Sequence, residues 1–144
     1  VLETLLEFAV HDLCARGIGA ILVYQPNLEL VASFEHRLPP PPPLDITEPT
    51  DLAPLRHALA QLDGAAMFDA AGRLQAMGVR LVPTTRSENE VDGIGGTRHT
   101  SARRYSADDA GATVIVVSED GPVTVMRRGH LLGASPTEAD PLDD

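Results

Sequence analysis

The chain has 144 residues and a mass of 15.3 kDa, which fits one compact domain and leaves no room for a second core of normal size. Its 21 acidic residues outnumber 11 basic ones, all of them arginine, and the formal net charge is -10. This charge argues against nucleic acid as a partner of the domain, because binding a phosphate backbone requires a net cationic face. A small anionic ligand held by a local group of arginines remains compatible with it.

Cysteine content and hydropathy favour a cytoplasmic protein. The single cysteine, Cys14, excludes an internal disulfide and suits a reducing compartment. No apolar run approaches the roughly 18 residues that span a bilayer, and the start VLETLLEF carries acids where a signal peptide carries bases. Because the sequence begins at Val1 and ends in ASPTEADPLDD, we expect a piece of a longer protein, with a domain at 1–134 and a polar tail or linker at 135–144.

The first 43 residues predict a helix, a hairpin and a proline insertion. Apolar residues recur at helical spacing over 2–16, so an amphipathic helix is expected to stop at Gly17. The β-prone runs 20–24 and 28–34 predict a hairpin, and the first, AILVY, is apolar enough to be buried on both faces. Prolines 39–43 predict a stiff surface insertion, with a ligand for a proline-binding module as the alternative.

The middle of the chain predicts a second helix and a second hairpin. Asp51 is placed to cap a helix that ends at Asp63-Gly64, with a buried stripe at Leu52, Leu55, Leu59 and Leu62. Two β-prone runs then flank the turn residues 69–72 and predict a hairpin of AAMF with RLQAMGV.

The last third predicts a loop, a helix and a third hairpin. Residues 83–96 are polar and glycine-rich, so a loop is expected to lead to Thr97 as the N-cap of a helix ending near Asp109. The runs 112–118 and 122–128 predict the final hairpin. The order of elements predicts an α/β fold with a mixed central sheet flanked by helices, rather than a regular doubly wound sheet.

The stretch from Gly96 to Ala102 has the chemistry of an anion site. The glycine allows a ligand to approach the backbone, and the free N–H groups of a helix start favour phosphate. Thr97 can donate a hydroxyl, Arg98 presents a planar fork to phosphate oxygens, and His99 can bind phosphate or a metal ion. By spacing alone, ordinary helix capping explains the same residues.

Carboxylates occur at two further strand ends. Asp63, followed by Gly64 and Ala65, is expected at the entrance of a strand, where it can bind Mg²⁺ or Mn²⁺ or accept a proton from a hydroxyl. Ser118 and Glu119 end the most apolar strand and are expected to face the same pocket. The alternative interpretation is that all of them are turn residues.

Together these segments resemble the diadenylate cyclase domain family, which includes the nucleotide-binding domain of the DNA-integrity scanning protein DisA. The family's D-G-A motif corresponds to residues 63–65, and its G-T-R-H-R-x-A motif to residues 96–102. The family strand V-I-V-V-S-E corresponds to residues 114–119, and its G-x-x-L-P loop is echoed at 78–83. The resemblance covers roughly residues 1–130.

The resemblance implies a nucleotidyltransferase of bacterial second-messenger signalling, which condenses two ATP molecules into cyclic di-AMP and releases two pyrophosphates. Two domains would face each other, and a divalent metal, Mg²⁺ or Mn²⁺, would be required. By the same resemblance Asp63 would sit by the ribose 3′-hydroxyl and the metal, with His99 as a second candidate ligand. Thr97, Arg98 and His99 would hold phosphates beside Gly64, Ala65 and Gly96. Ser118 and Glu119 would complete the phosphate and metal side of the site, and the backbone near Leu81 would contact adenine.

The sequence departs from the family pattern at one position. The second arginine of R-H-R is Thr100 here, and Arg103 or Arg104, on the same side of the expected helix, is the candidate to replace it. Two further hypotheses therefore stay open beside the active cyclase. One is a weak or inactive nucleotide-binding sensor of the same family, and the other is a structural domain that displays the proline segment.

Overall fold

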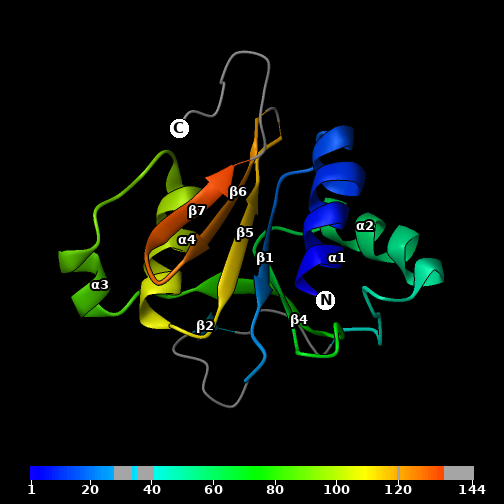
Figure 1. The fold of residues 1–144 in the computed structure, drawn as a ribbon, viewed down its shortest axis with the longest axis horizontal. Helices are drawn as coiled ribbons and strands as arrows, with labels where there is room; N and C mark the ends of the chain where they lie inside the picture. Colours follow the sequence, from blue (N-terminus) through cyan, green and yellow to red (C-terminus); the bar gives the residue numbers. More distant parts are fainter. Residues whose placement is uncertain (28–33, 36–40, 120, 135–144) are drawn as a thin grey trace.

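The computed structural model describes residues 1–27, 34–35, 41–119 and 121–134. These residues form a seven-stranded mixed sheet in the order β2-β4-β3-β1-β5-β6-β7 (Figure 1). β1 lies parallel to β3, and the other neighbours pair antiparallel. The strands are β1 (Ala20–Tyr24), β2 (Phe34–Glu35), β3 (Ala65–Phe68), β4 (Leu74–Leu81), β5 (Thr113–Val117), β6 (Val123–Arg127) and β7 (His130–Ala134).

Helices cover both faces of the sheet. α1 (Leu2–Glu7) continues through a π-helical segment (Phe8–Leu13) and a 3-10 turn (Cys14–Arg16). It lies with α2 (Leu52–Gln61) on one face, whereas α4 (Thr97–Asp108) lies on the other, next to α3 (Thr85–Glu90) (Figure 1). Among the described residues, no helix combines the length and the apolar character needed to cross a membrane.

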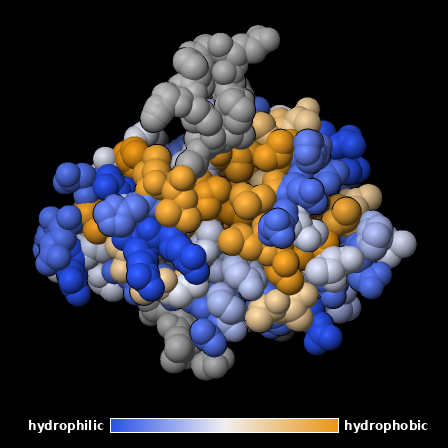
Figure 2. Space-filling model, in the orientation of Figure 1, coloured by the Kyte–Doolittle hydropathy of each residue, from blue (hydrophilic) through white to orange (hydrophobic). Residues whose placement is uncertain are grey.

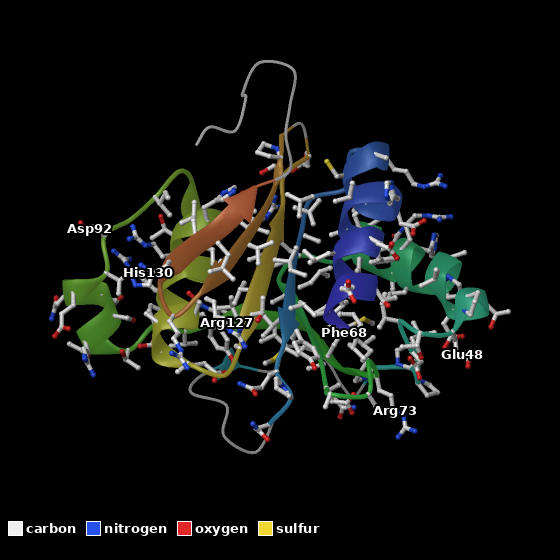
Figure 3. All side chains as sticks on the ribbon, in the orientation of Figure 1. Glu48, Phe68, Arg73, Asp92, Arg127 and His130 are labelled. Atoms are coloured by element: carbon white, nitrogen blue, oxygen red, sulfur yellow. The ribbon has the colours of Figure 1, made fainter. Side chains whose placement is uncertain are left out.

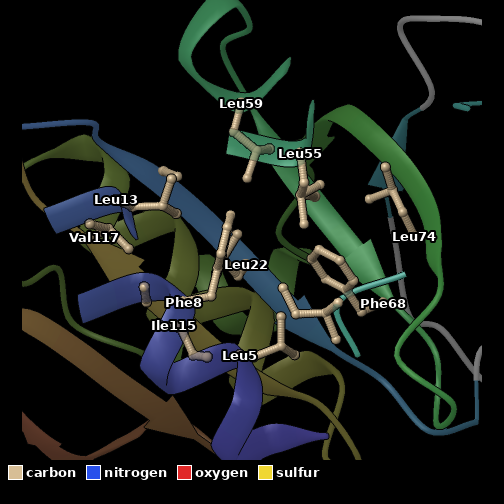
Figure 4. Packing of buried hydrophobic residues seen from close by; sticks show 14 of the residues in the cluster. Leu5, Phe8, Leu13, Leu22, Leu55, Leu59, Phe68, Leu74, Ile115 and Val117 are labelled. Carbon is tan, nitrogen blue, oxygen red and sulfur yellow. The ribbon is translucent and has the colours of Figure 1, made fainter. Parts of the chain in front are cut away.

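Alternation along the central strands divides the core into two clusters. On the α1 and α2 face, Leu22 and Ile115 pack among the leucines of both helices and two phenylalanines (Figure 4). On the α4 face, Ile21 and Val114 pack with Tyr105. Since β1 contributes to both clusters, its AILVY sequence is explained by burial on both faces.

Several sequence predictions are confirmed. The chain is an α/β fold with a mixed sheet flanked by helices, the hairpins β3–β4 and β5–β6 form, and residues 2–16 are helical throughout. Gly17 ends that segment with a φ of 71°, a left-handed conformation that favours glycine. Asp51 is the N-cap residue of α2, but its Oδ2 accepts from the backbone N–H of Asp45 instead of capping the helix.

The predicted hairpin of residues 20–24 with 28–34 is wrong. β1 lies between β3 and β5, while β2 pairs with the end of β4, through Phe34 opposite Leu81. The physical reason is that both edges of β1 are already hydrogen-bonded, one to β3 and the other to β5, so neither edge is left for β2. Residues 28–33 of the second predicted strand lie outside the described part of the chain.

Three elements were not predicted, the first being a 3-10 turn (Pro49–Asp51) that precedes α2. α3 interrupts the expected loop at 83–96, and β7 follows β6 through a tight turn in which Arg128 and Gly129 both have positive φ. Of the proline run, residues 39–40 are outside the described part, whereas Pro42 and Pro43 are exposed and have no regular structure. The predicted tail at 135–144 also lies outside it, so the domain boundary stays a prediction.

Apolar surface gathers over one part of the molecule. In Figure 2 hydrophobic side chains occupy the middle of the visible face, where Figure 1 shows β5, β6 and β7, and hydrophilic ones flank them. Leu131 and Leu132 of β7 are the exposed large hydrophobic residues of the described chain, at 45% and 60%.

A buried polar network joins the end of α4 to the end of β1. Asp109 accepts from Tyr105 Oη at 2.9 Å and from Gln25 Nε2 at 2.6 Å, and all three side chains are buried. The carboxylate thus has a donor on each oxygen, which offsets the cost of burying it. Burial and the carboxylate of Asp109 raise the pKa of Tyr105, so its hydroxyl stays a donor.

Tyr105→Phe is expected to destabilise the domain by about 1–3 kcal/mol, because Asp109 keeps its buried charge but loses one donor. Urea unfolding followed by circular dichroism measures this. Tyr24→Phe, which removes the hydroxyl of the other tyrosine, is the matched control and is expected to change stability by less than about 0.5 kcal/mol. Equal losses in the two variants would contradict the role given to the network.

Candidate functional site

Strand register brings the predicted motifs to one end of the sheet. Ile21 of β1 lies opposite Ala65 of the parallel strand β3, and Ala65 lies opposite Val79 of β4. Ala20 lies opposite Val117 of antiparallel β5. The starts of β1 and β3 therefore meet the ends of β4 and β5, and α4 begins at the same place.

A cleft of about 610 Å³ opens at this end of the sheet. It brings together the D-G-A motif, the end of β4 with its following loop, and the first turns of α4. Its lining residues are Gly19, Ala20, Ile21, Leu62, Asp63, Gly64, Ala65, Val79, Arg80, Leu81, Pro83, Glu88, Thr97, Arg98 and Ser101. Apolar side chains form the wall on the sheet side, and the start of α4 supplies polar groups and a cation.

The start of α4 has the features of an anion cradle. Gly96, not Thr97, is the N-cap residue, which corrects the sequence prediction by one position. The first helical bond runs from the Thr100 N–H to the Gly96 carbonyl at 3.0 Å, so the amides of residues 97–99 lie before the hydrogen-bonded ladder. Thr97 is exposed and does not serve as the cap. These amides, at the positive end of the helix dipole, suit an anionic oxygen.

Arg98 joins the cleft to two smaller hollows. It lines the main cleft, a hollow of about 490 Å³ with His99, Ser118 and Glu119, and a hollow of about 290 Å³ that also contains Asp63. Its Nη2 lies 3.9 Å from Oε1 of Glu119, and both side chains are partly exposed. Because water screens an exposed pair at this distance, the guanidinium is held only weakly and can turn to a stronger anion.

Gly19 makes room for this arginine. A Cβ added at Gly19 would lie 2.5 Å from Nη1 of Arg98 and 2.9 Å from Cγ of Glu119. A glycine before β1 therefore lets the Arg98–Glu119 pair lie against the backbone. Gly19 was not predicted as a site residue, although the spacing of Gly17 and Gly19 before a buried strand is a signal for close approach of the backbone.

The glycine of the D-G-A motif has a structural role. Gly64 has a φ of 103°, and a Cβ there would lie 2.8 Å from the carbonyl oxygen of Val79. The residue thus turns the chain and packs against β4, which fixes the direction in which β3 leaves the loop. Asp63 before it is exposed and lines both the cleft and the smallest hollow.

The predicted site residues divide into two groups. Asp63, Gly64, Ala65, Leu81, Thr97 and Arg98 line the main cleft. Gly96, His99, Ser118 and Glu119 line the adjoining 490 Å³ hollow instead, where Thr97 and Arg98 connect the two. The other nine cleft residues were not predicted as part of the site, and those with polar or charged side chains are Arg80, Glu88 and Ser101.

Thr100 and its two candidate substitutes face away from the cleft. The Thr100 hydroxyl accepts from the Ile94 N–H at 3.0 Å and donates to the Ile94 carbonyl at 3.1 Å. Arg103 donates to the carbonyls of Gly129 and Asp92, and Arg104 donates to that of Val91. Neither arginine lines the cleft or either hollow, so the expectation that one of them replaces the missing cation is wrong for this arrangement.

The donor set fits a metal ion shared with phosphates. Asp63 and Glu119 line one hollow, while His99 and Asp63 share none of the three. Within the described residues no group of three His, Cys, Asp or Glu side chains gathers as a metal site. Mg²⁺ commonly takes one or two carboxylates and completes its shell with water and substrate phosphates. The carboxylates of Asp63 and Glu119, beside the proposed phosphate cradle, match that pattern. His99 shares a hollow with Glu119 but not with Asp63.

The pKa of His99 is lowered below 6.5, chiefly because the ring is partly buried and secondly because Arg98 is close. Folding therefore favours the neutral ring, and the protein loses stability as pH falls below that value. In Arg98→Gln the pKa of His99 is expected to rise but to stay below 6.5, because burial is the larger cause. NMR titration of the histidine ring protons, assigned with His99→Gln, measures it; a midpoint above 6.5 in the unsubstituted protein would contradict the account.

Comparisons with known proteins agree with this geometry. A family model described as "DAC: DisA bacterial checkpoint controller nucleotide-binding" matches residues 7–131. No curated protein matches the chain.

Among solved structures, a protein titled "hypothetical membrane spanning protein" from Bacillus cereus is 26% identical, with a TM-score of 0.65. The alignment covers 93% of this chain and 63% of that one, so the chain spans less than two thirds of its structural relative. The family match extends over the strands, the cleft and α4. This chain belongs to the DAC family of DisA-type nucleotide-binding domains.

Proposed function

We propose that this domain is a diadenylate cyclase, which binds ATP in the cleft and condenses two ATP molecules into cyclic di-AMP with release of two pyrophosphates. One observation carries the proposal: in a chain of the DAC family, the Asp63 carboxylate and the start of α4 with Arg98 line the same cleft. A carboxylate facing an anion cradle across one cleft is what transfer of a nucleotidyl group to a hydroxyl requires.

The two ends of the cleft suit the two ends of ATP. The amides of residues 97–99, the Thr97 hydroxyl and Arg98 offer donors to the triphosphate. Ile21, Leu81 and Pro83 offer an apolar wall to the adenine ring. The backbone of β4 near Leu81 is the proposed partner of the base edge, and Ala65 lines the same cleft.

The reaction needs a base, an aligned phosphate and a leaving group. In our proposal the ribose 3′-oxygen of one ATP attacks the α-phosphorus of the other, its proton passes to Asp63, and the bond from that phosphorus to pyrophosphate breaks. A second attack, by the 3′-oxygen of the other ATP on the α-phosphorus of the first, releases the second pyrophosphate and closes the cyclic dinucleotide. Arg98 neutralises charge on the phosphates, and His99, in its neutral form, donates or accepts a hydrogen bond beside Ser118.

A divalent cation, Mg²⁺ or Mn²⁺, supplies charge neutralisation for the triphosphate and polarises the reacting phosphorus when bound. Asp63 and Glu119 are its proposed protein ligands, with His99 as a further candidate. This assignment gives Glu119 two alternatives, an ion pair with Arg98 or a ligand position. Because the pair is 3.9 Å long and partly exposed, exchanging one for the other costs little.

The reaction requires two copies of the domain whose clefts face each other, since each ATP supplies both a nucleophile and an electrophile. We propose such a pair as the active species, with no role for nucleic acid in this domain. The proposal places it in the cytoplasm, where ATP is available and the free thiol of Cys14, which donates to the Gly121 carbonyl at 3.2 Å, stays reduced.

One observation favours a second candidate, a nucleotide-binding sensor without turnover. Thr100 occupies the position of the second family arginine, and Arg103 and Arg104 are bound to backbone carbonyls elsewhere. The transferring phosphates therefore have one cation fewer at the start of α4. Loss of one such contact can slow transfer by about two to three orders of magnitude without preventing ATP binding.

Product formation separates the two candidates. Incubation with ATP and Mn²⁺ or Mg²⁺, followed by chromatography, is expected to yield cyclic di-AMP. Asp63→Asn is expected to lower the rate by about 10²–10⁴-fold, because the base is lost while the fold is retained. Glu48→Gln, on the side of the molecule away from α4 (Figure 3), is the control for loss of a carboxylate. ATP binding without product across metal and protein concentrations would contradict the cyclase and leave the sensor.

Gly19→Ala is expected to weaken ATP binding by about tenfold, the equivalent of about 1.4 kcal/mol. The new methyl group would displace the end of Arg98, a flexible side chain, so little loss of stability is expected. Calorimetric titration with ATP, together with the melting temperature, measures both effects. Unchanged ATP affinity in a variant with a normal melting temperature would remove Arg98 from the proposed phosphate site.

A further inference from the structure

The loop that leads to α4 is tied to the helix by three of the helix's own side chains. Thr100, Arg103 and Arg104 occupy positions i, i+3 and i+4, which lie on one side of a helix. All three bond to backbone groups of residues 91–94. We call this arrangement, Thr100, Arg103 and Arg104 with the backbone of Val91, Asp92 and Ile94, the loop clip.

Thr100 makes the clip's closest contact with the phosphate cradle. Its one hydroxyl satisfies both the N–H and the carbonyl of Ile94, at 3.0 and 3.1 Å, and a Cβ added at Gly93 would lie 3.3 Å from the same oxygen. Gly95 follows at once with a φ of 59°, and Gly96 then opens the helix. Fixing Ile94 therefore fixes the two glycines whose conformation directs the first amides of α4.

The outer part of the clip supports this role. Arg103 bonds to both the Asp92 carbonyl and the Gly129 carbonyl, so it joins the loop to the turn before β7. In Figure 3 Asp92 lies on the loop beside α3, at the outer side of the molecule. Asp92 and Gly93 are exposed, whereas Ile94 is partly buried and packs against the core cluster on the α4 face, so the hydrogen bonds of the clip act together with this apolar contact to order the loop.

We propose that Thr100 is the positioning residue of the phosphate-binding turn: its hydroxyl holds Ile94 and thereby orders Gly95, Gly96 and the amides of residues 97–99 for an anion. The inference rests on the proposed function in taking that anion to be the triphosphate of ATP. It also changes the meaning of the departure at Thr100. Thr100 replaces the positive charge of the family's second arginine with hydrogen bonds to Ile94. The ordered amides then compensate part of the anion stabilisation that the arginine would provide.

The test compares four proteins with inorganic pyrophosphate as the probe. Thr100→Val keeps the shape of the side chain but removes the hydroxyl, and is expected to weaken pyrophosphate binding by about fivefold. Thr100→Ser keeps the hydroxyl and is expected to bind as the unsubstituted protein does. Thr50→Val, the same change at an exposed position before α2, is the matched control. Amide hydrogen exchange at Ile94 is expected to quicken in Thr100→Val alone.

A fourth variant, Thr100→Arg, tests whether a positive charge at this position or the hydrogen bonds to Ile94 contribute more to anion binding. Thr100→Arg restores a positive charge but removes both bonds to Ile94, and is expected to bind pyrophosphate less tightly than the unsubstituted protein. Tighter binding by Thr100→Arg, or unchanged binding by Thr100→Val, would overturn the inference, as would an unsubstituted protein that does not bind pyrophosphate. If that protein binds pyrophosphate but forms no cyclic di-AMP, the proposed reaction fails while the Thr100 variants still decide the role of the clip.

Discussion

The parallel pairing of β1 with β3 is the constraint on which the site depends. It sets the starts of both strands at one end of the sheet, and the antiparallel neighbours β4 and β5 then end there. Segments 100 residues apart in the chain, those of Gly19 and Glu119, are thus brought into contact around Arg98. Because successive side chains of β1 alternate between the two core clusters, slipping this register by one residue would exchange them between the clusters, so the core and the site are fixed together.

Local turn chemistry explains which parts of the fold could be predicted. The hairpins around residues 69–72 and 119–121 follow from short polar turns between β-prone runs, and both form. The partners of β1 are set by tertiary burial, which adjacency in sequence does not reveal. α3 lacks an apolar stripe; it is held by Thr84, whose Oγ1 accepts from the Ser87 N–H, and by Asp108 from α4, so its stabilising partner lies 24 residues away. β7 depends on a turn with positive φ at Arg128, an unusual residue for that conformation.

The site was predictable where chemistry and motif coincide. Asp63 and Arg98 were expected together and line one cleft. Gly19 and Glu88 were missed because their place in the cleft follows from strand register and from α3, neither of which the sequence pattern indicates. The motif indicated only that Thr100 lacks the positive charge of the family's second arginine. In the structure its hydroxyl hydrogen-bonds to both the N–H and the carbonyl of Ile94. The net charge of -10 likewise describes the whole chain, while the start of α4 presents amides and Arg98 to the cleft and His99 to the adjoining hollow.

The central claim is that the cleft binds a nucleotide with its phosphates at the start of α4. Titration of the ¹⁵N-labelled domain with a non-hydrolysable ATP analogue and Mg²⁺, followed through backbone amide shifts, tests it most directly. The account predicts the largest shifts at residues 95–99, with smaller ones at Gly64, Ala65 and Leu81. Shifts confined to the separate hollow between α3 and Asp108, or no saturable shifts at all, would contradict it.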